Sequence, residues 1–68
     1  MPTNSNLLRA KIAEKGFTQI EVARNIGITY QSFSAKINNK SAFRVSEIIK
    51  LCELLDIADK ESYFFATD

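Results

Sequence analysis

The first half of the chain contains a clear signal for the start of a helix, and this signal lies between two glycines. Thr18 and Glu21 have the Thr-x-x-Glu spacing of a capping box, in which each side chain bonds the other residue's backbone N–H. Gly16 lies just before this start and Gly27 follows the helix that it opens. Glycine readily adopts the positive φ at which helices end. This part of the chain is therefore expected to fold as short helices joined by sharp turns.

Apolar residues at helical spacing predict a helix on each side of this central one. The first is expected over residues 5–15, with Asn4 or Ser5 as its N-cap and Gly16 as its stop. The next is expected over residues 30–38, with Thr29 as its N-cap. The pairs expected on the inward faces of these two helices are Leu8 with Ile12, and Phe33 with Ile37.

The remainder of the chain predicts one strongly apolar helix and an aromatic tail. Residues 45–55 are apolar around most of the helix, which favours the centre of a bundle or a partner interface. Residues 59–62 can form one further turn, and Tyr63 to Ala66 are expected to be an extended tail or short strand. The prediction is an all-α, compact bundle of about five short helices, forming a single domain over residues 1–68 with its C-terminal tail at 58–68.

The composition excludes several classes of protein. Among 68 residues Cys52 is the only cysteine, so no intrachain disulfide can form. The chain has no histidine, so it cannot assemble a Cys/His zinc site or use histidine-based catalysis. No apolar stretch is long enough to cross a membrane, and residues 1–6 lack the apolar segment of a signal peptide. We expect a cytoplasmic protein that is not an enzyme and has no cofactor, metal or small-molecule ligand.

The charges are unevenly distributed along the chain. The formal net charge is only +1. Residues 1–44 carry seven bases and two acids, a net +5, whereas residues 45–68 carry two bases and six acids, a net −4. Such asymmetry suggests one face for a polyanion and another for a different contact. Random charge placement in a short chain is the alternative explanation.

The two central helices fit a helix-turn-helix over about residues 18–38. Two short helices joined by a glycine-containing turn pack at a steep angle, and Ala23 supplies the small residue that such packing needs where the helices touch. The pattern resembles the phage Cro/CI-type (Xre-type) helix-turn-helix repressors, and most closely a short Cro-type or single-domain repressor. The resemblance rests on Thr18-Gln19-Ile20-Glu21-Val22-Ala23, Ile26-Gly27-Ile28-Thr29, Phe33, Ile37-Asn38-Asn39-Lys40 and the apolar stretch Val45 to Ile57.

This resemblance implies a lambda-repressor-like DNA-binding domain and roles for the matched residues. The base contacts that it implies are Tyr30, Gln31, Ser34 and Ala35. The implied phosphate contacts are Thr18, Gln19, Ser32, Asn38, Asn39, Lys40 and Arg44. The Gln31 amide suits the paired N6/N7 edge of adenine. Gln19 is also expected to brace the Gln31 side chain. Tyr30, Ala35 and Asn39 depart from the residues common in the family. Tyr30 is expected to stack, to contact a thymine methyl, or to contact the sugar-phosphate.

The expected function is sequence-specific binding of double-stranded operator DNA, as a repressor in a bacterial or phage-infected cell. One recognition helix reads too few base pairs for specificity, so a homodimer on a palindromic operator is expected. The candidate dimer interface is Ile57, Tyr63, Phe64 and Phe65. The alternative is a protein-interaction module of the same fold, an antitoxin or an adaptor, whose partner site is this aromatic tail.

Overall fold

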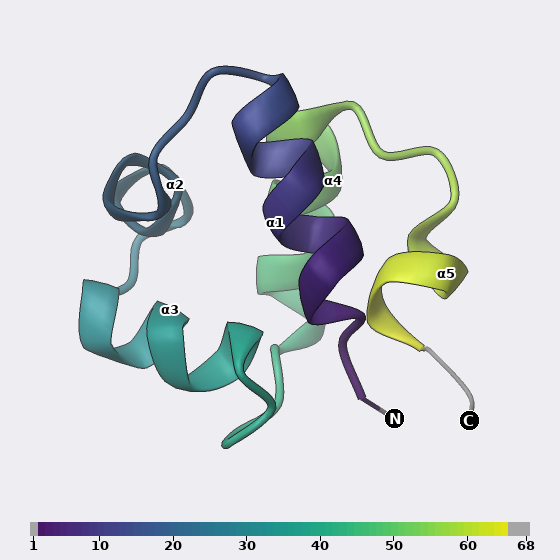
Figure 1. Ribbon diagram of the computed structural model, residues 1–68. Helices are drawn as coiled ribbons and strands as arrows, with labels where there is room; N and C mark the ends of the chain where they lie inside the picture. The colour runs from purple at the N-terminus through teal and green to yellow at the C-terminus, as the bar shows by residue number, and fades with distance from the viewer. Residues whose placement is uncertain (1, 66–68) are drawn as a thin grey trace.

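Five short helices make up the fold. The computed structural model describes residues 2–65, and residues 66–68 of the expected C-terminal tail lie outside them. In that range the chain contains helices and no strand, which confirms the all-α prediction (Figure 1). The helices are α1 (Ser5–Glu14), α2 (Gln19–Ile26), α3 (Tyr30–Ile37), α4 (Val45–Leu55) and α5 (Lys60–Phe64). No helix among these residues is long and apolar enough to span a bilayer.

The predicted capping signals set the bounds of α2. The Thr18 hydroxyl accepts a hydrogen bond from the Glu21 backbone N–H at 3.1 Å, and Glu21 Oε1 accepts one from the Thr18 N–H at 2.8 Å. At the other end Gly27 has φ +83°, a left-handed conformation that costs any other L residue energy. Thr29 then caps α3 through its hydroxyl, which accepts the Ser32 N–H at 3.1 Å.

The two helices of the expected helix-turn-helix, α2 and α3, pack directly against each other. Ala23 is buried, and its carbonyl accepts the Ile28 N–H at 3.0 Å across the turn. In Figure 1 α2 is seen end-on while α3 runs across the view, so their axes are steeply inclined. The small residue Ala23 is therefore buried within α2 and bonded to the turn that leads into α3.

The core lies between α4 and the other helices. Its buried side chains are Leu8, Ile12, Val22, Ala23, Ile26, Phe33, Ile37, Ile48, Leu51, Leu55, Ile57 and Phe64. Phe43, in the loop before α4, contacts Phe33 and Phe64 edge-to-face, with ring centroids 5.8 and 5.7 Å away. Aromatic pairs of this geometry add stabilisation beyond the area that they bury. They connect α3 to α5, which are far apart in sequence.

The expectation of an extended aromatic tail is wrong for Tyr63 and Phe64, which belong to α5. Asp59 begins this helix, since its carboxylate accepts the Ser62 N–H at 3.3 Å and the Ser62 hydroxyl at 2.6 Å. The Tyr63 carbonyl accepts the Asn4 N–H at 2.8 Å, which joins α5 to the start of α1. Burial of Phe64 in the core outweighs the preference of consecutive aromatic residues for extended backbone.

Candidate nucleic-acid interface

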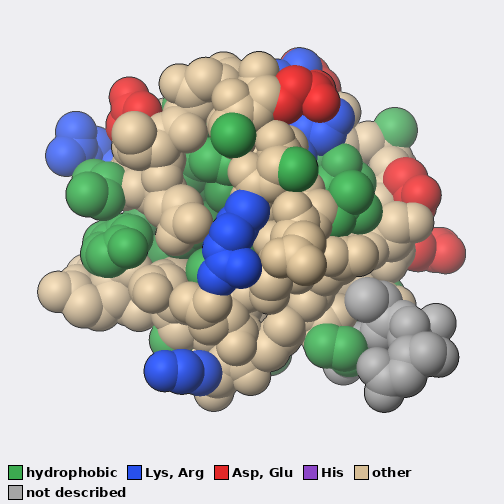
Figure 2. Space-filling model, viewed as in Figure 1, with side chains coloured by type: hydrophobic (Ala, Val, Ile, Leu, Met, Phe, Trp, Pro, Cys, Tyr) green, Lys and Arg blue, Asp and Glu red, His purple; other side chains and the backbone are tan. Residues whose placement is uncertain are grey.

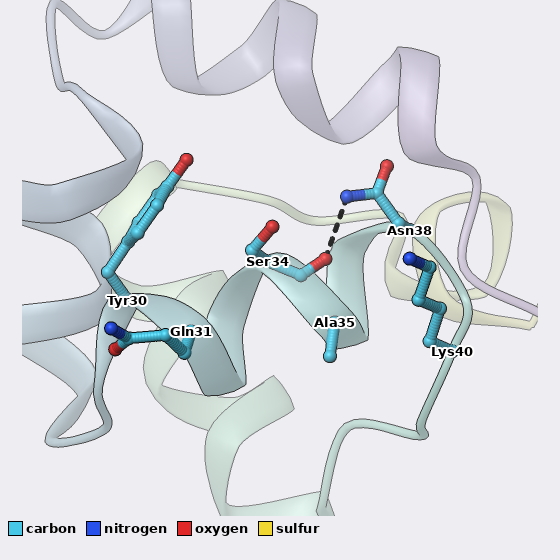
Figure 3. A pocket seen from close by; sticks show the side chains of 6 residues that line it. All are labelled: Tyr30, Gln31, Ser34, Ala35, Asn38 and Lys40. Atoms are coloured by element: carbon cyan, nitrogen blue, oxygen red, sulfur yellow. Dashed lines mark hydrogen bonds between the residues drawn. The ribbon is translucent and has the colours of Figure 1, made fainter.

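The outer face of α3 forms an open hollow lined by both polar and apolar side-chain surface. The hollow has a volume of about 260 Å³ and opens to solvent. Its lining comes from α3 and the turn after it (Figure 3), and the residues are Tyr30, Gln31, Ser34, Ala35, Asn38 and Lys40. We call this the α3 hollow. It brings together all four residues expected to contact bases and two of those expected to contact phosphate.

The side chains lie along the helix in chain order. Figure 3 shows Tyr30 at the start of α3 and Lys40 beyond its end, with Gln31, Ser34 and Ala35 between them. Tyr30 and Gln31 are exposed. The surface therefore offers an aromatic ring, an amide, a hydroxyl, a methyl group and an ammonium along α3 and the turn that follows it.

Three contacts from the N-terminal segment hold the end of α3. Asn39 Oδ1 accepts the Thr3 N–H at 2.7 Å and Asn39 Nδ2 donates to the Thr3 carbonyl at 2.9 Å. The Ser5 hydroxyl donates to the Ile37 carbonyl, and Arg9 Nη2 donates to Asn38 Oδ1. Asn39 has φ +62°, a conformation that asparagine tolerates better than most residues.

These contacts change the expected roles of Asn38 and Asn39. Asn38 Nδ2 also donates to the Ser34 carbonyl at 2.8 Å, so both polar ends of its side chain are engaged within the protein. The Asn39 side chain is likewise bonded to Thr3. Both amides therefore position the end of α3, a role in addition to the phosphate contact expected of them, which stays a prediction. Sequence reasoning missed Thr3, Ser5 and Arg9 because no local pattern pairs them with α3.

A nearly buried ion pair joins α3 to the start of α4. Lys36 Nζ lies 2.7 and 2.8 Å from the two Glu47 oxygens, and their side chains are only 11% and 9% exposed. Glu47 Oε1 also accepts the Arg44 N–H at 2.9 Å. Burial by itself raises the pKa of Glu47, but the hydrogen bonds from Lys36 and Arg44 outweigh it and hold the pKa below its ordinary value. This pair was not predicted from the sequence.

The start of α2 provides weaker support for phosphate binding. Glu21 accepts the Thr18 N–H, so its carboxylate lies at the N-terminus of α2. An anion such as phosphate would approach this same terminus, and the carboxylate repels it. Gln19 is half-buried, and no hydrogen bond in the described part of the chain joins it to Gln31, so the expected brace is not formed here.

On the face shown in Figure 2, acidic side chains lie away from the surface over α3. Figure 2 shows them towards the top and right of the molecule, whereas the surface over α3, at lower left, carries basic and uncharged side chains. Two cations expected near phosphate, Lys40 and Arg44, are exposed close to the end of α3. Ser32 is half-buried in the first turn of α3, where its N–H donates to the hydroxyl of the capping residue Thr29.

The four residues expected at a dimer interface have different environments. Ile57 and Phe64 are only 8% and 3% exposed because they belong to the core, so they offer little surface to a partner. Tyr63 is half-buried, and Phe65 is exposed. Val45 and Ile49, one turn apart on the outer side of α4, are also exposed.

Residues 2–65 contain no group of three His, Cys, Asp or Glu side chains placed to hold a metal ion. Cys52 packs beside the core, and burial raises the pKa of its thiol. A raised pKa disfavours the thiolate, which is the reactive form of a cysteine nucleophile.

Residues 1–67 match the family model described as "Protein of unknown function (DUF739)". No curated protein matches the chain. The description of the family states no activity, so the arrangement of the residues themselves has to carry the functional argument.

Proposed function

Since this chain belongs to the DUF739 family, to which no function is attached, we propose from its own residues that it is a sequence-specific double-stranded DNA-binding regulator. It acts as a repressor in a bacterial or phage-infected cell, binding palindromic operator DNA as a dimer with α3 in the major groove. One observation carries the proposal. The exposed face of a capped two-helix unit forms an open hollow that gathers side chains suited to base edges.

The chemistry of the α3 hollow suits direct reading of base pairs. The major groove of B-DNA admits an α-helix and presents a distinct donor and acceptor pattern for each base pair. Gln31 can donate to and accept from adenine, and the Ala35 methyl can pack on the methyl group of thymine. Tyr30, at the start of α3, contacts the same edges or the adjoining sugar.

The way α3 is held supports specific binding. Thr29 fixes its first turn, the Lys36–Glu47 ion pair fixes its side, and the Thr3–Asn39 contacts fix the turn beyond it. A reading surface that is ordered before binding avoids the entropic cost of ordering it on DNA. The net charge of +5 over residues 1–44 provides attraction to phosphate that does not depend on sequence.

A dimer is needed because a single α3 reads few base pairs. Two-fold symmetry places two recognition helices about 34 Å apart, one turn of DNA. Tyr63 and Phe65 remain the candidates for the contact, since Ile57 and Phe64 are in the core. The exposed surface that these two offer is small, so the dimer is expected to form on DNA more readily than in free solution.

Fluorescence anisotropy with labelled duplex DNA across a salt series tests this function. We expect saturable binding that weakens steeply as salt rises, because each neutralised phosphate releases a counterion. Lys40→Gln should weaken binding, whereas Lys60→Gln, which removes an exposed cation of α5, should not. Failure of the wild type to bind duplex at low salt would refute the proposal. Binding without salt dependence would refute its electrostatic part.

The exposed apolar residues favour a second candidate, a protein-interaction module of the antitoxin or adaptor type. Val45 of α4 is 72% exposed and Ile49 of the same helix is 52% exposed. Phe65, which follows α5, is also exposed. Isolation at physiological salt discriminates between the candidates. Recovery with a stoichiometric protein partner, together with no retardation of duplex DNA, would favour this second candidate.

A further inference from the structure

Arg9 comes from α1 but lies at the end of the DNA-reading helix. Its Nη2 donates to Asn38 Oδ1, and Asn38 lines the α3 hollow. Figure 1 shows the N-terminal part of α1 on the side of the molecule where α3 ends. The hydrogen bond to Asn38 places the Arg9 guanidinium beside a residue that lines the hollow. Nothing in the sequence around Arg9 indicates this position.

Arg9 differs in its partners from Lys11 of α1 and from Lys15, the C-cap of that helix. Lys11 is paired with Glu14 at 3.2 Å, and Lys15 with Asp56 at 3.1 Å. In the described part of the chain no carboxylate lies within ion-pair distance of Arg9, whose contact is a neutral amide oxygen. A guanidinium has five N–H donors, so this one hydrogen bond leaves most of them available.

The end of α3 needs such a cation if phosphate is to approach. The C-terminus of a helix carries a partial negative charge and repels anions. Asn38, which caps this end, offers no charge, and its side-chain oxygen is taken by Arg9. Lys40 is the nearest cation further along the chain and lines the same hollow.

We infer that Arg9 binds a DNA backbone phosphate at the end of α3, and that Asn38 is the residue that positions it. The planar fork of arginine matches two phosphate oxygens at once, and Lys40 adds a second charge beside it. The phosphate contact expected of Asn38 thus passes to the side chain that Asn38 holds. This inference rests on the proposed function and extends the DNA surface from α3 to α1.

Arg9→Gln tests the inference in the same anisotropy salt series. Glutamine retains helix propensity and length but not charge. The slope of log affinity against log salt should become shallower by about one per bound protomer, and affinity at 0.1 M salt should fall about eightfold, equally for all duplex sequences. Asn38→Ala should lower affinity with a smaller change in slope, because the cation remains but is no longer held.

Lys15→Gln is the matched control, since it removes one charge from the C-cap of the same helix, at a cation paired with Asp56. Lys15→Gln should leave the slope unchanged, and circular dichroism should show that Arg9→Gln, Asn38→Ala and Lys15→Gln are all folded. An unchanged slope for Arg9→Gln, or an equal change for Lys15→Gln, would overturn the inference while leaving the proposed function intact. Absence of binding by the wild type would instead overturn the proposed function, and this inference with it.

Discussion

Replacing Glu47 with alanine should destabilise the protein more than any other single change of a charged residue in residues 2–65. The substitution leaves Lys36, whose side chain is 11% exposed, without its partner, and it removes the acceptor of the Arg44 N–H. Breaking a buried ion pair by removing one partner costs about 3–5 kcal/mol. The flexible lysine stem can move its ammonium towards water, so we expect a cost near the lower end, about 3 kcal/mol.

That cost is large for a chain of this length. Domains are stabilised by roughly 0.05–0.15 kcal/mol per residue, which gives about 3–10 kcal/mol for 68 residues. Urea unfolding followed by circular dichroism measures the change. With a slope of about 1 kcal/mol per molar urea, the midpoint should fall by about 3 M or the variant should be unfolded without denaturant.

The double variant Lys36→Met, Glu47→Leu is the control. Replacing both charges by apolar side chains of similar volume is often neutral, so it should recover most of the stability that Glu47→Ala loses. A cost below about 0.5 kcal/mol for Glu47→Ala would refute the reasoning, because that is the range of an ordinary surface substitution. A double variant as unstable as the single one would refute the explanation by an uncompensated charge.

Three further predictions concern the pH dependence and the turn between α2 and α3. Because the pKa of Glu47 is lowered in the folded state, its ionised form contributes stability that is present above the ordinary glutamate pKa of about 4.3 and is lost as pH falls through the lowered value. Urea midpoints measured from pH 7 to 3 should therefore decline less for Glu47→Gln than for the wild type. Gly27→Ala should cost about 1–2 kcal/mol in thermal unfolding, because alanine must adopt φ +83°, and an unchanged Tm would contradict this. Ala23→Leu should lower the free energy of unfolding by about 1–3 kcal/mol, because the larger side chain overfills the buried site of Ala23. It should also abolish duplex binding by changing the angle between α2 and α3. Full DNA binding by a stable Ala23→Leu variant would disprove that role.

Local signals predicted most of the helices because their ends are encoded by neighbouring residues. The caps at Thr18 and Thr29 and the stop at Gly27 lie where expected, and α4 has the predicted bounds. The expected first and third helices each end one residue earlier in the structure. Bonds within one helical turn decide these features, so a single sequence is sufficient to locate them.

The errors arose where distant residues decide the conformation. Phe64 is helical and buried because it packs on Phe43, a contact that no local pattern reveals. The same applies to the Thr3–Asn39 contacts and the Arg9–Asn38 hydrogen bond, which join the N-terminal segment to α3 across about thirty residues of chain. The sequence therefore located the residues of the α3 hollow but missed the side chains that hold it in place.

Parallel selection of duplexes from a random pool by the wild type and by Gln31→Ala tests the central claim that α3 reads DNA. We predict that the wild type enriches a two-fold palindrome whose half-site centres lie 10–10.5 base pairs apart. Gln31→Ala should enrich the same palindrome with preference relaxed at one or two positions in each half. No enrichment by a folded wild type, or an unaltered preference in the variant, would contradict the claim.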